Sequence, residues 1–214
     1  IVLGKSIPYR GSLGTSIVRA FDNVLALTGW NEKRIKAANI PYATTTITGY
    51  DHASYYPNAL PITMKILFDP VTGRIYGAQA YGIEGVDKRI DVIATAITGG
   101  LTVEDLSLTQ LTYSPPFGSA RDVANIAGLA ARNVRDGLVN PTYDFENPHN
   151  PNKKVQLLDV RPRESAALSP VPNSINIPYK ELNNVDLKLF DKDTEYQTIC
   201  LWGKTAYFSS RILQ

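Results

Sequence analysis

The chain has 214 residues, of which 43% are hydrophobic and 20% are charged, and its formal net charge is +2. These values are close to the globular average and allow one or two domains. The small net charge, without a run of Lys or Arg, excludes an obvious nucleic-acid or anionic-membrane partner. No stretch approaches the roughly 20 apolar residues that a membrane helix needs.

Cysteine and histidine are rare in this chain. The single cysteine, Cys200, excludes an internal disulphide framework and favours a reducing, cytoplasmic setting. The two histidines, His52 and His149, are far apart, and no Cys/His cluster has metal-ligand spacing, so we expect no structural metal. Residues 1–4 (IVLG) lack a starting Met and a signal-peptide pattern. They indicate a chain entered in the middle of a protein.

The first third of the chain reads mainly as strands. Residues 16–27 are mostly apolar and predict one buried strand. Asn31 can cap a short helix over 32–38, and the β-branched residues 44–49 predict another strand. A loop rich in polar and aromatic residues follows at 50–59.

A β-hairpin is the clearest element. Residues 62–68 and 74–81 are predicted strands, and the sequence DPVTG at 69–73 supplies the turn. Both strands carry apolar residues on two faces. This suggests one face on the core and one against another layer or a partner chain.

Three helices follow the hairpin. Helical spacing predicts the first over 86–97, Thr102 and Asp105 form a capping box that opens a short helix ending near residue 111, and a longer helix spans 120–137. A charged group at the first helix predicts a solvated helix start: Glu84, Asp87, Lys88 and Arg89. Helices grouped around an antiparallel sheet indicate an α+β fold.

The composition changes after residue 139. Residues 140–152 contain three prolines and four asparagines and predict a linker. A βαβ-type pattern then begins, with strands at 155–160, 174–177 and 198–202 and a helix at 206–213. We therefore expect one domain at 1–139 and the front part of a second, α/β domain at 153–214. The second has about 60 residues, fewer than the ~100–150 of a typical domain.

The sequence offers no nucleotide-binding loop. It contains no G-x-G-x-x-G and no Walker motif. We therefore expect no cofactor bound to this segment alone.

Cys200 is the strongest candidate for chemistry. It stands at the end of a predicted strand and is followed by LWGKT at 201–205 and a helix. Backbone N–H groups, the positive end of the helix dipole and the Lys204 cation all favour the reactive thiolate there. Gly203 would let the loop curl tightly. The alternative is that Cys200 is a small buried hydrophobic residue.

Three tyrosines are the next candidates. Tyr113 precedes two prolines, which stiffen its loop, so its hydroxyl has a defined position from which it can donate a hydrogen bond or a proton. Tyr55 and Tyr56 follow His52 in the 50–59 loop and suit a ligand contact or an interface. Plain packing is the alternative for all three tyrosines, and we expect His52 to be a surface residue without a role.

Residues 1–139 contain an ordered series of motifs: GTSIVRAFD (14–22), TG (28–29) with NE (31–32), YYP (55–57), KILFD (65–69), GRIYGAQ (73–79) and LTYSPPF (111–117). Together and in this order, they resemble the pyridine nucleotide-disulphide oxidoreductase dimerisation domain. The closest branch is the group of coenzyme A-disulphide reductases and NADH oxidases.

The tail contains the motifs LDVR (158–161), VPNSINIP (171–178) and CLWGKT (200–205), followed by Tyr207 and RIL (211–213). Together these motifs resemble a rhodanese-like domain. Coenzyme A-disulphide reductases with a fused rhodanese domain have this order of domains. The pairing of the two resemblances is more specific than either alone.

The resemblance implies a homodimeric flavoprotein that uses FAD and NAD(P)H, both bound by domains that precede this segment. It implies that Tyr113 and Tyr55, or else Tyr56, bracket a disulphide or persulphide and help to protonate the leaving thiolate. It also implies that Cys200 carries a persulphide in a cradle of Gly203, Lys204 and Thr205.

We therefore interpret the chain as the C-terminal part of a coenzyme A-disulphide or persulphide reductase that is inactive as an isolated segment. A rhodanese-type sulfurtransferase that uses Cys200 and a non-catalytic dimerisation module are the alternatives. The sequence leaves open coenzyme A disulphide, coenzyme A persulphide, polysulphide or oxygen as the substrate, and NADH or NADPH as the donor.

Overall fold

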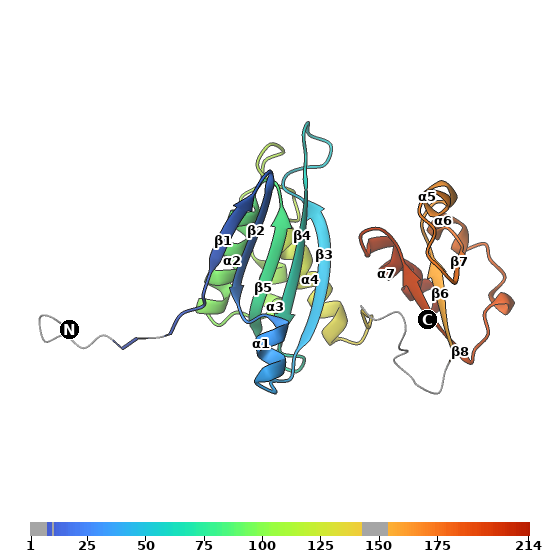
Figure 1. Cartoon of the computed structure of the whole chain (residues 1–214), viewed down its shortest axis with the longest axis horizontal. Coiled ribbons are helices and arrows are strands. Elements are labelled where there is room, and N and C mark those ends of the chain that lie inside the picture. Colours follow the sequence, from blue (N-terminus) through green and yellow to red (C-terminus); the bar gives the residue numbers. More distant parts are fainter. Residues whose placement is uncertain (1–7, 10, 143–153) are drawn as a thin grey trace, which may run out of the picture.

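The computed structural model describes residues 8–9, 11–142 and 154–214. The described residues form two β-sheets with separate hydrophobic cores. The first sheet has five strands in the order β1-β2-β5-β4-β3, all antiparallel, and the second has three parallel strands in the order β7-β6-β8 (Figure 1). The expected antiparallel α+β fold is thus confirmed for the first part of the chain.

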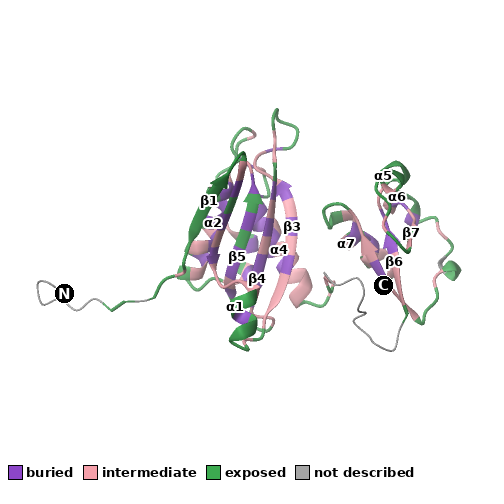
Figure 2. Ribbon diagram, viewed as in Figure 1, coloured by how far each residue is buried: buried purple, intermediate pink, exposed green. Residues whose placement is uncertain are grey.

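The first expected strand is in fact a hairpin. Strand β1 (Ser16–Ala20) turns at Phe21 and Asp22 into β2 (Asn23–Gly29), where a single buried strand over 16–27 was predicted. Phe21 adopts a φ of 55°, which permits the tight turn. All of β1 is exposed at the edge of the sheet, as Figure 2 shows. The apolar run contains no Gly or Pro, so its composition concealed the turn.

The other strands of this sheet follow the prediction. Strands β4 (Pro61–Phe68) and β5 (Ile75–Gly82) form the expected hairpin, and β3 (Ala43–Tyr50) pairs with β4. The turn is stabilised by Asp69, whose carboxylate accepts hydrogen bonds from the amides of Val71 and Thr72 at 2.8 and 2.9 Å.

The helices begin at capping residues. Asn31 caps α1 (Glu32–Ala37) by accepting from the amide of Arg34, as expected. Helix α2 spans Val86–Thr98, and the expected capping box of Thr102 and Asp105 opens α3 (Val103–Leu108). Helix α4 (Val123–Arg135) begins three residues later than predicted, because Asp122 caps it.

Helices α2, α3 and α4 cover one face of the five-stranded sheet (Figure 1). The core between them is aliphatic and aromatic, and it includes Ile62, Met64, Ile66, Phe68, Ile90, Ile93, Leu106, Val123 and Ala127. The even-numbered residues of β4 are buried, and since side chains alternate between the two faces of a strand, they all lie on the face that the helices cover. The loops at 50–60 and 113–122 are therefore attached at both ends to elements that pack on this core.

The second sheet contains β6 (Lys154–Asp159), β7 (Ser174–Asn176) and β8 (Thr194–Ile199). Strand β8 begins at Thr194, four residues before the expected start at 198. Helix α7 (Lys204–Leu213) was predicted, whereas three short helical segments were not: α5 (Arg163–Leu168), α6 (Tyr179–Leu182) and η1 (Leu187–Leu189). The core of this part is small, with Leu158, Val160, Leu182 and Ala206 fully buried or nearly so.

Most of the predicted linker at 140–152, including His149, lies outside the described residues, as do residues 1–4. Two contacts join the parts on either side of this linker. Arg211 Nη1 donates to the Leu138 carbonyl at 3.2 Å, and the rings of Tyr50 and Trp202 meet edge to face with centroids 5.4 Å apart. No helix in the described part of the chain is long and apolar enough to cross a membrane.

Candidate active site

Two of the predicted tyrosines meet in space. The hydroxyl oxygens of Tyr55 and Tyr113 are 2.8 Å apart, although the residues are 58 positions apart in the sequence. The two side chains are 75% and 47% exposed, so both phenols remain open to a ligand. The hydrogen bond with Tyr55 is the main cause that raises the pKa of Tyr113. Tyr113 therefore stays protonated near neutral pH and can donate a hydrogen bond.

The loop that carries Tyr55 is closed at its base by Asp51. The backbone amide of Asp51 donates to the Leu60 carbonyl at 2.9 Å, and its carboxylate accepts from the Leu60 amide at 2.7 Å. Within the loop, the Tyr56 amide donates to the Ala53 carbonyl at 2.8 Å. These bonds hold a ten-residue excursion in one shape.

His52 is part of this loop structure, which corrects the expectation of a surface residue without a role. Its side chain is 13% exposed, and its ring nitrogens lie 3.0 Å from the Asp51 carboxylate and 3.1 Å from the Pro57 carbonyl. Both partners only accept hydrogen bonds, so the doubly protonated ring satisfies both. The Pro57 carbonyl, and then Asp51, raise the pKa of His52. Tyr56 packs edge-on against this ring, with centroids 5.9 Å apart.

The Tyr113 loop is tied to the Tyr55 loop by two hydrogen bonds. The amide of Ala53 donates to the Pro115 carbonyl at 3.2 Å, and Ser119 Oγ donates to the His52 carbonyl at 3.0 Å. The loop is also closed on itself, because the Phe117 amide donates to the Ser114 carbonyl at 2.8 Å. The tyrosine pair therefore lies at the tip of two loops that are hydrogen-bonded to each other.

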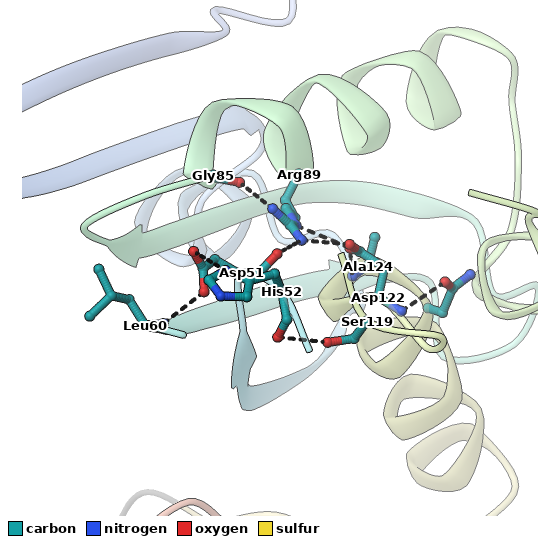
Figure 3. Close-up of polar contacts among 9 residues, drawn as sticks. Asp51, His52, Leu60, Gly85, Arg89, Ser119, Asp122 and Ala124 are labelled. Carbon is teal, nitrogen blue, oxygen red and sulfur yellow. Dashed lines mark hydrogen bonds and ion pairs between the residues drawn. The ribbon is translucent and has the colours of Figure 1, made fainter. Parts of the chain in front are cut away.

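Arg89 lies behind both loops, contrary to the prediction of a solvated helix start. Glu84 and Asp87 are exposed, but Arg89 is only 2% exposed and forms an ion pair of 2.7 Å with Asp122, which is 4% exposed. Figure 3 shows its guanidinium between Asp51 and Asp122. The charged composition of the segment concealed this buried arginine.

Cys200 occupies the expected turn between strand β8 and helix α7. Its sulfur accepts hydrogen bonds from the amides of Gly203 at 3.1 Å and Ala206 at 3.3 Å. Gly203 has a φ of 81°, a conformation that side chains rarely adopt, and this lets the chain curl around the sulfur. Lys204 and Thr205 form the first turn of α7.

Arg161, the last residue of the LDVR motif, was not named from the sequence as a candidate site residue. Its guanidinium is hydrogen-bonded to Asp159 at 2.7 to 3.1 Å and donates to the Ser169 carbonyl at 2.8 Å. Asp159 is the main cause that raises the pKa of Arg161, and the charge of Cys200 adds to it. The buried Asp159 carboxylate thus fixes the position of the Arg161 guanidinium.

Within the described residues, the structure does not bring Cys200 into contact with either tyrosine. The segments that carry the two sites touch at Tyr50 and Trp202, whose rings are in contact. Tyr50 immediately precedes the loop of Tyr55, and Trp202 lies two residues after Cys200. No group of three or more His, Cys, Asp or Glu gathers in the described ranges in a way that could hold a metal ion.

The family model of the "Pyridine nucleotide-disulphide oxidoreductase, dimerisation domain" matches residues 16–124. This is half of the chain, and it contains both tyrosine loops and Arg89. The chain belongs to this family. The five-stranded sheet with helices α2, α3 and α4 is thus a dimerisation domain.

Curated relatives of this dimerisation domain include two reductases. The chain is 35% identical to the coenzyme A disulfide reductase of Staphylococcus aureus over 127 residues, which are 59% of this chain and 28% of that protein. It is also 35% identical to the Staphylococcus epidermidis enzyme of the same name over 128 residues, 60% of this chain and 29% of that protein. The chain therefore spans less than a third of the curated relatives it matches.

Two solved structures resemble nearly the whole chain, beyond the dimerisation domain. Reduced Bacillus anthracis CoADR-RHD is 40% identical with a TM-score of 0.85, over 96% of this chain and 37% of that one. An NAD-dependent persulfide reductase from A. fulgidus is 34% identical with a TM-score of 0.87, over 99% of this chain and 38% of that one. Their coverage includes the part that carries Cys200.

Sequence reasoning named the tyrosines and Cys200 as candidates and missed the residues that hold the tyrosine loops in place. The tyrosines and Cys200 stand in recognisable motifs. Arg89, Asp122 and Ser119 have no such motif, and their partners are 33 to 67 residues away. The one available signal was an arginine at helical spacing beside the apolar Val86 and Ile90.

Proposed function

We propose that this chain is the dimerisation part of a homodimeric reductase that acts on coenzyme A disulphide, coenzyme A persulphide or polysulphide with NAD(P)H. The observation that carries the proposal is the exposed pair of hydroxyls of Tyr55 and Tyr113, 2.8 Å apart. Both lie in the part of the chain that matches the family. Coenzyme A disulfide reductases and a persulfide reductase are among the relatives, which supports these substrates.

The tyrosine pair suits the protonation of a leaving thiolate. When a disulphide is cleaved, one sulfur leaves with the electron pair of the broken bond and must gain a proton. In the pair, one phenol donates to the other, and the accepting phenol keeps its own proton for the substrate sulfur. The raised pKa of Tyr113 means that this phenol is protonated near neutral pH, before the substrate is cleaved. Tyr55 serves as its partner, while Tyr56 supports the loop by packing on His52.

FAD and NAD(P)H belong to the intact protein in this proposal. The chain has no G-x-G-x-x-G loop that would suit a dinucleotide, so its residues do not fit either cofactor and we assign none to it. We place both cofactors in a portion that precedes this segment. The flavin would supply the electrons there, and this chain would bind and protonate the substrate.

For the tail we propose a partial rhodanese-like domain at 153–214, after the domain at 1–139 and the linker at 140–152. Two backbone amides at 3.1 and 3.3 Å from Cys200 Sγ favour a thiolate or a persulphide there, and Gly203, Lys204 and Thr205 form the wall of this cradle. The thiolate attacks the outer sulfur of a persulphide R–S–SH, which leaves Cys200–S–SH and releases R–S⁻ without net oxidation. A thiolate acceptor at the tyrosine site would then attack the outer sulfur, which turns the acceptor into a persulphide and releases the Cys200 thiolate.

The two-fold assembly is part of the proposal. The Tyr55 and Tyr113 side chains are exposed on this chain, so a second protomer can complete the pocket around them. We place the enzyme in the cytoplasm because the single cysteine of this chain is a free thiol of the kind kept reduced there. Sedimentation of the purified protein as a monomer would contradict the assembly.

The decisive assay uses the protein expressed with the cofactor-binding portion that precedes this segment in the family. Consumption of NADH or NADPH should depend on coenzyme A disulphide or persulphide and should fall in Tyr113→Phe. Turnover no higher than the background rate without substrate would contradict the proposal.

The cradle of Cys200 favours one second candidate, a sulfurtransferase in which the dimerisation domain only joins two protomers. Transfer of sulfur from thiosulphate to cyanide that is lost in Cys200→Ser, without disulphide-dependent consumption of NAD(P)H, would establish it. Absence of both activities would leave a non-catalytic dimerisation module.

A further inference from the structure

The two exposed phenols do not hold themselves in place. Their mutual hydrogen bond is the only one that either hydroxyl forms with the described residues. A bond between two largely exposed side chains contributes little against the rotamer entropy that it removes. Their 2.8 Å approach must therefore come from the loops that carry them.

Arg89 binds to the base of both loops at once. From α2, its Nη2 donates to the Asp51 carbonyl at 2.5 Å, at the start of the Tyr55 loop. The same guanidinium binds both carboxylate oxygens of Asp122, through Nε at 3.2 Å and Nη2 at 2.7 Å. Asp122 ends the Tyr113 loop and caps α4 by accepting from the Ala124 amide at 3.0 Å. Figure 3 shows the guanidinium between these partners.

The fork shape of arginine is needed for this arrangement. Its remaining nitrogen, Nη1, donates to the Gly85 carbonyl at 3.1 Å, so all three guanidinium nitrogens are used. Lysine has one nitrogen at the end of a flexible chain and cannot reach a carboxylate, Asp51 and Gly85 together. Gly85 leaves room for the fork, because a Cβ there would lie 2.4 Å from Nη1.

We propose that Arg89 is a positioning residue that sets the distance between the hydroxyls of Tyr55 and Tyr113. It acts through Asp51 on one loop and Asp122 on the other, and it touches neither phenol. The inference rests on the proposed function only in taking this pair to face the substrate. A purely structural role would instead make Arg89 a stabiliser of the α2–α4 packing with no influence on the phenols.

The test reads the tyrosine pair directly. Tyr113 is replaced by 3-fluorotyrosine in the full-length protein, and the ¹⁹F shift gives its ionisation midpoint. Tyr55→Phe should lower this midpoint, because the hydrogen bond with Tyr55 raises the pKa of Tyr113. We expect Arg89→Lys to lower it to the same extent, and the double variant to add no further shift, since both changes break one interaction.

Arg135→Lys is the matched control. Arg135 is also a helix arginine that pairs with a carboxylate, Glu104 at 2.7 Å, but this pair joins α4 to α3 and contacts neither loop. The control should keep the original midpoint. A midpoint left unchanged in Arg89→Lys, or shifted equally in Arg135→Lys, would overturn the positioning role.

Activity separates this inference from the proposed function. In the full-length protein, Arg89→Lys should lower kcat/KM for coenzyme A disulphide by about 10-fold to 100-fold, as expected for misplaced reacting groups. If the midpoints shift as expected while the activity of all variants stays unchanged, the positioning role stands and the proposed function fails. If the activity falls in Arg89→Lys while the midpoint stays fixed, the positioning role fails.

Discussion

The two candidate sites are built in opposite ways. The cradle of Cys200 consists of one short stretch, in which the amides of Gly203 and Ala206 turn toward a sulfur three and six residues earlier. The tyrosine pair joins two loops 58 residues apart and depends on Arg89 in a third element. A site made by local backbone geometry survives changes elsewhere in the fold, whereas a site made by long-range contacts changes with its support.

The largest expected effect separates the two sites. In Asp122→Ala, the buried Arg89 loses its carboxylate and α4 loses its cap. Breaking such a buried pair lowers the free energy of unfolding by about 3–5 kcal/mol. Urea denaturation should show this loss, while the rate at which iodoacetamide alkylates Cys200 in native buffer stays unchanged. A slower or faster alkylation would mean that the two sites are not independent.

Glu104→Ala is the control for this change. Glu104 pairs with Arg132 and Arg135 at 2.9 and 2.7 Å, but its side chain is 38% exposed. Loss of an exposed pair should cost about 1 kcal/mol or less. An equal loss of stability in both variants would show that burial does not set the strength of the Arg89 pair.

The cradle should be sensitive to its own backbone. Gly203→Ala places a side chain at a φ of 81°, which strains the chain by about 1–2 kcal/mol. Relief of this strain would move the amide away from Cys200 and slow alkylation of the thiol. Gly100→Ala introduces the same kind of strain at a φ of 70° with open space around it, and alkylation should not change. Equal alkylation rates in the wild type, Gly203→Ala and Gly100→Ala would contradict a role for the Gly203 amide.

The smallest effect concerns pH and the Tyr55 loop. The Pro57 carbonyl raises the folded-state pKa of His52 above the unfolded value of about 6.5. The stabilisation that protonated His52 gives to the folded Tyr55 loop is therefore complete below about pH 6.5 and is lost as the pH rises through the folded-state pKa. The protection factor of the Tyr56 amide against hydrogen exchange should fall a few-fold over this range. His52→Phe should abolish this dependence, and the Ala166 amide should not show it.

The same contrast explains how much could be predicted. The 61–82 hairpin, the capping box at Thr102 and the turn at Cys200 follow from residues close together in sequence, and all three were predicted. The turn at Phe21 was missed because an apolar run looks alike in one strand or two. The burial of Arg89 was missed because its partners are 33 and 38 residues away.

Both tyrosines could be named from their motifs, but their contact could not. Tyr55 and Tyr56 are adjacent, and only the path of the loop turns Tyr55 toward Tyr113 and Tyr56 toward His52. That path depends on Asp51, Leu60 and Ser119, which no local pattern marks.

The most direct test of the account compares kcat/KM for coenzyme A disulphide in Tyr55→Phe, Tyr113→Phe and the double variant of the full-length protein. A hydrogen-bonded pair that acts as one unit predicts a loss of about 100-fold in Tyr113→Phe, a smaller loss in Tyr55→Phe, and no further loss in the double variant. Wild-type values in Tyr113→Phe, or losses that multiply in the double variant, would contradict the claim that the two phenols work together.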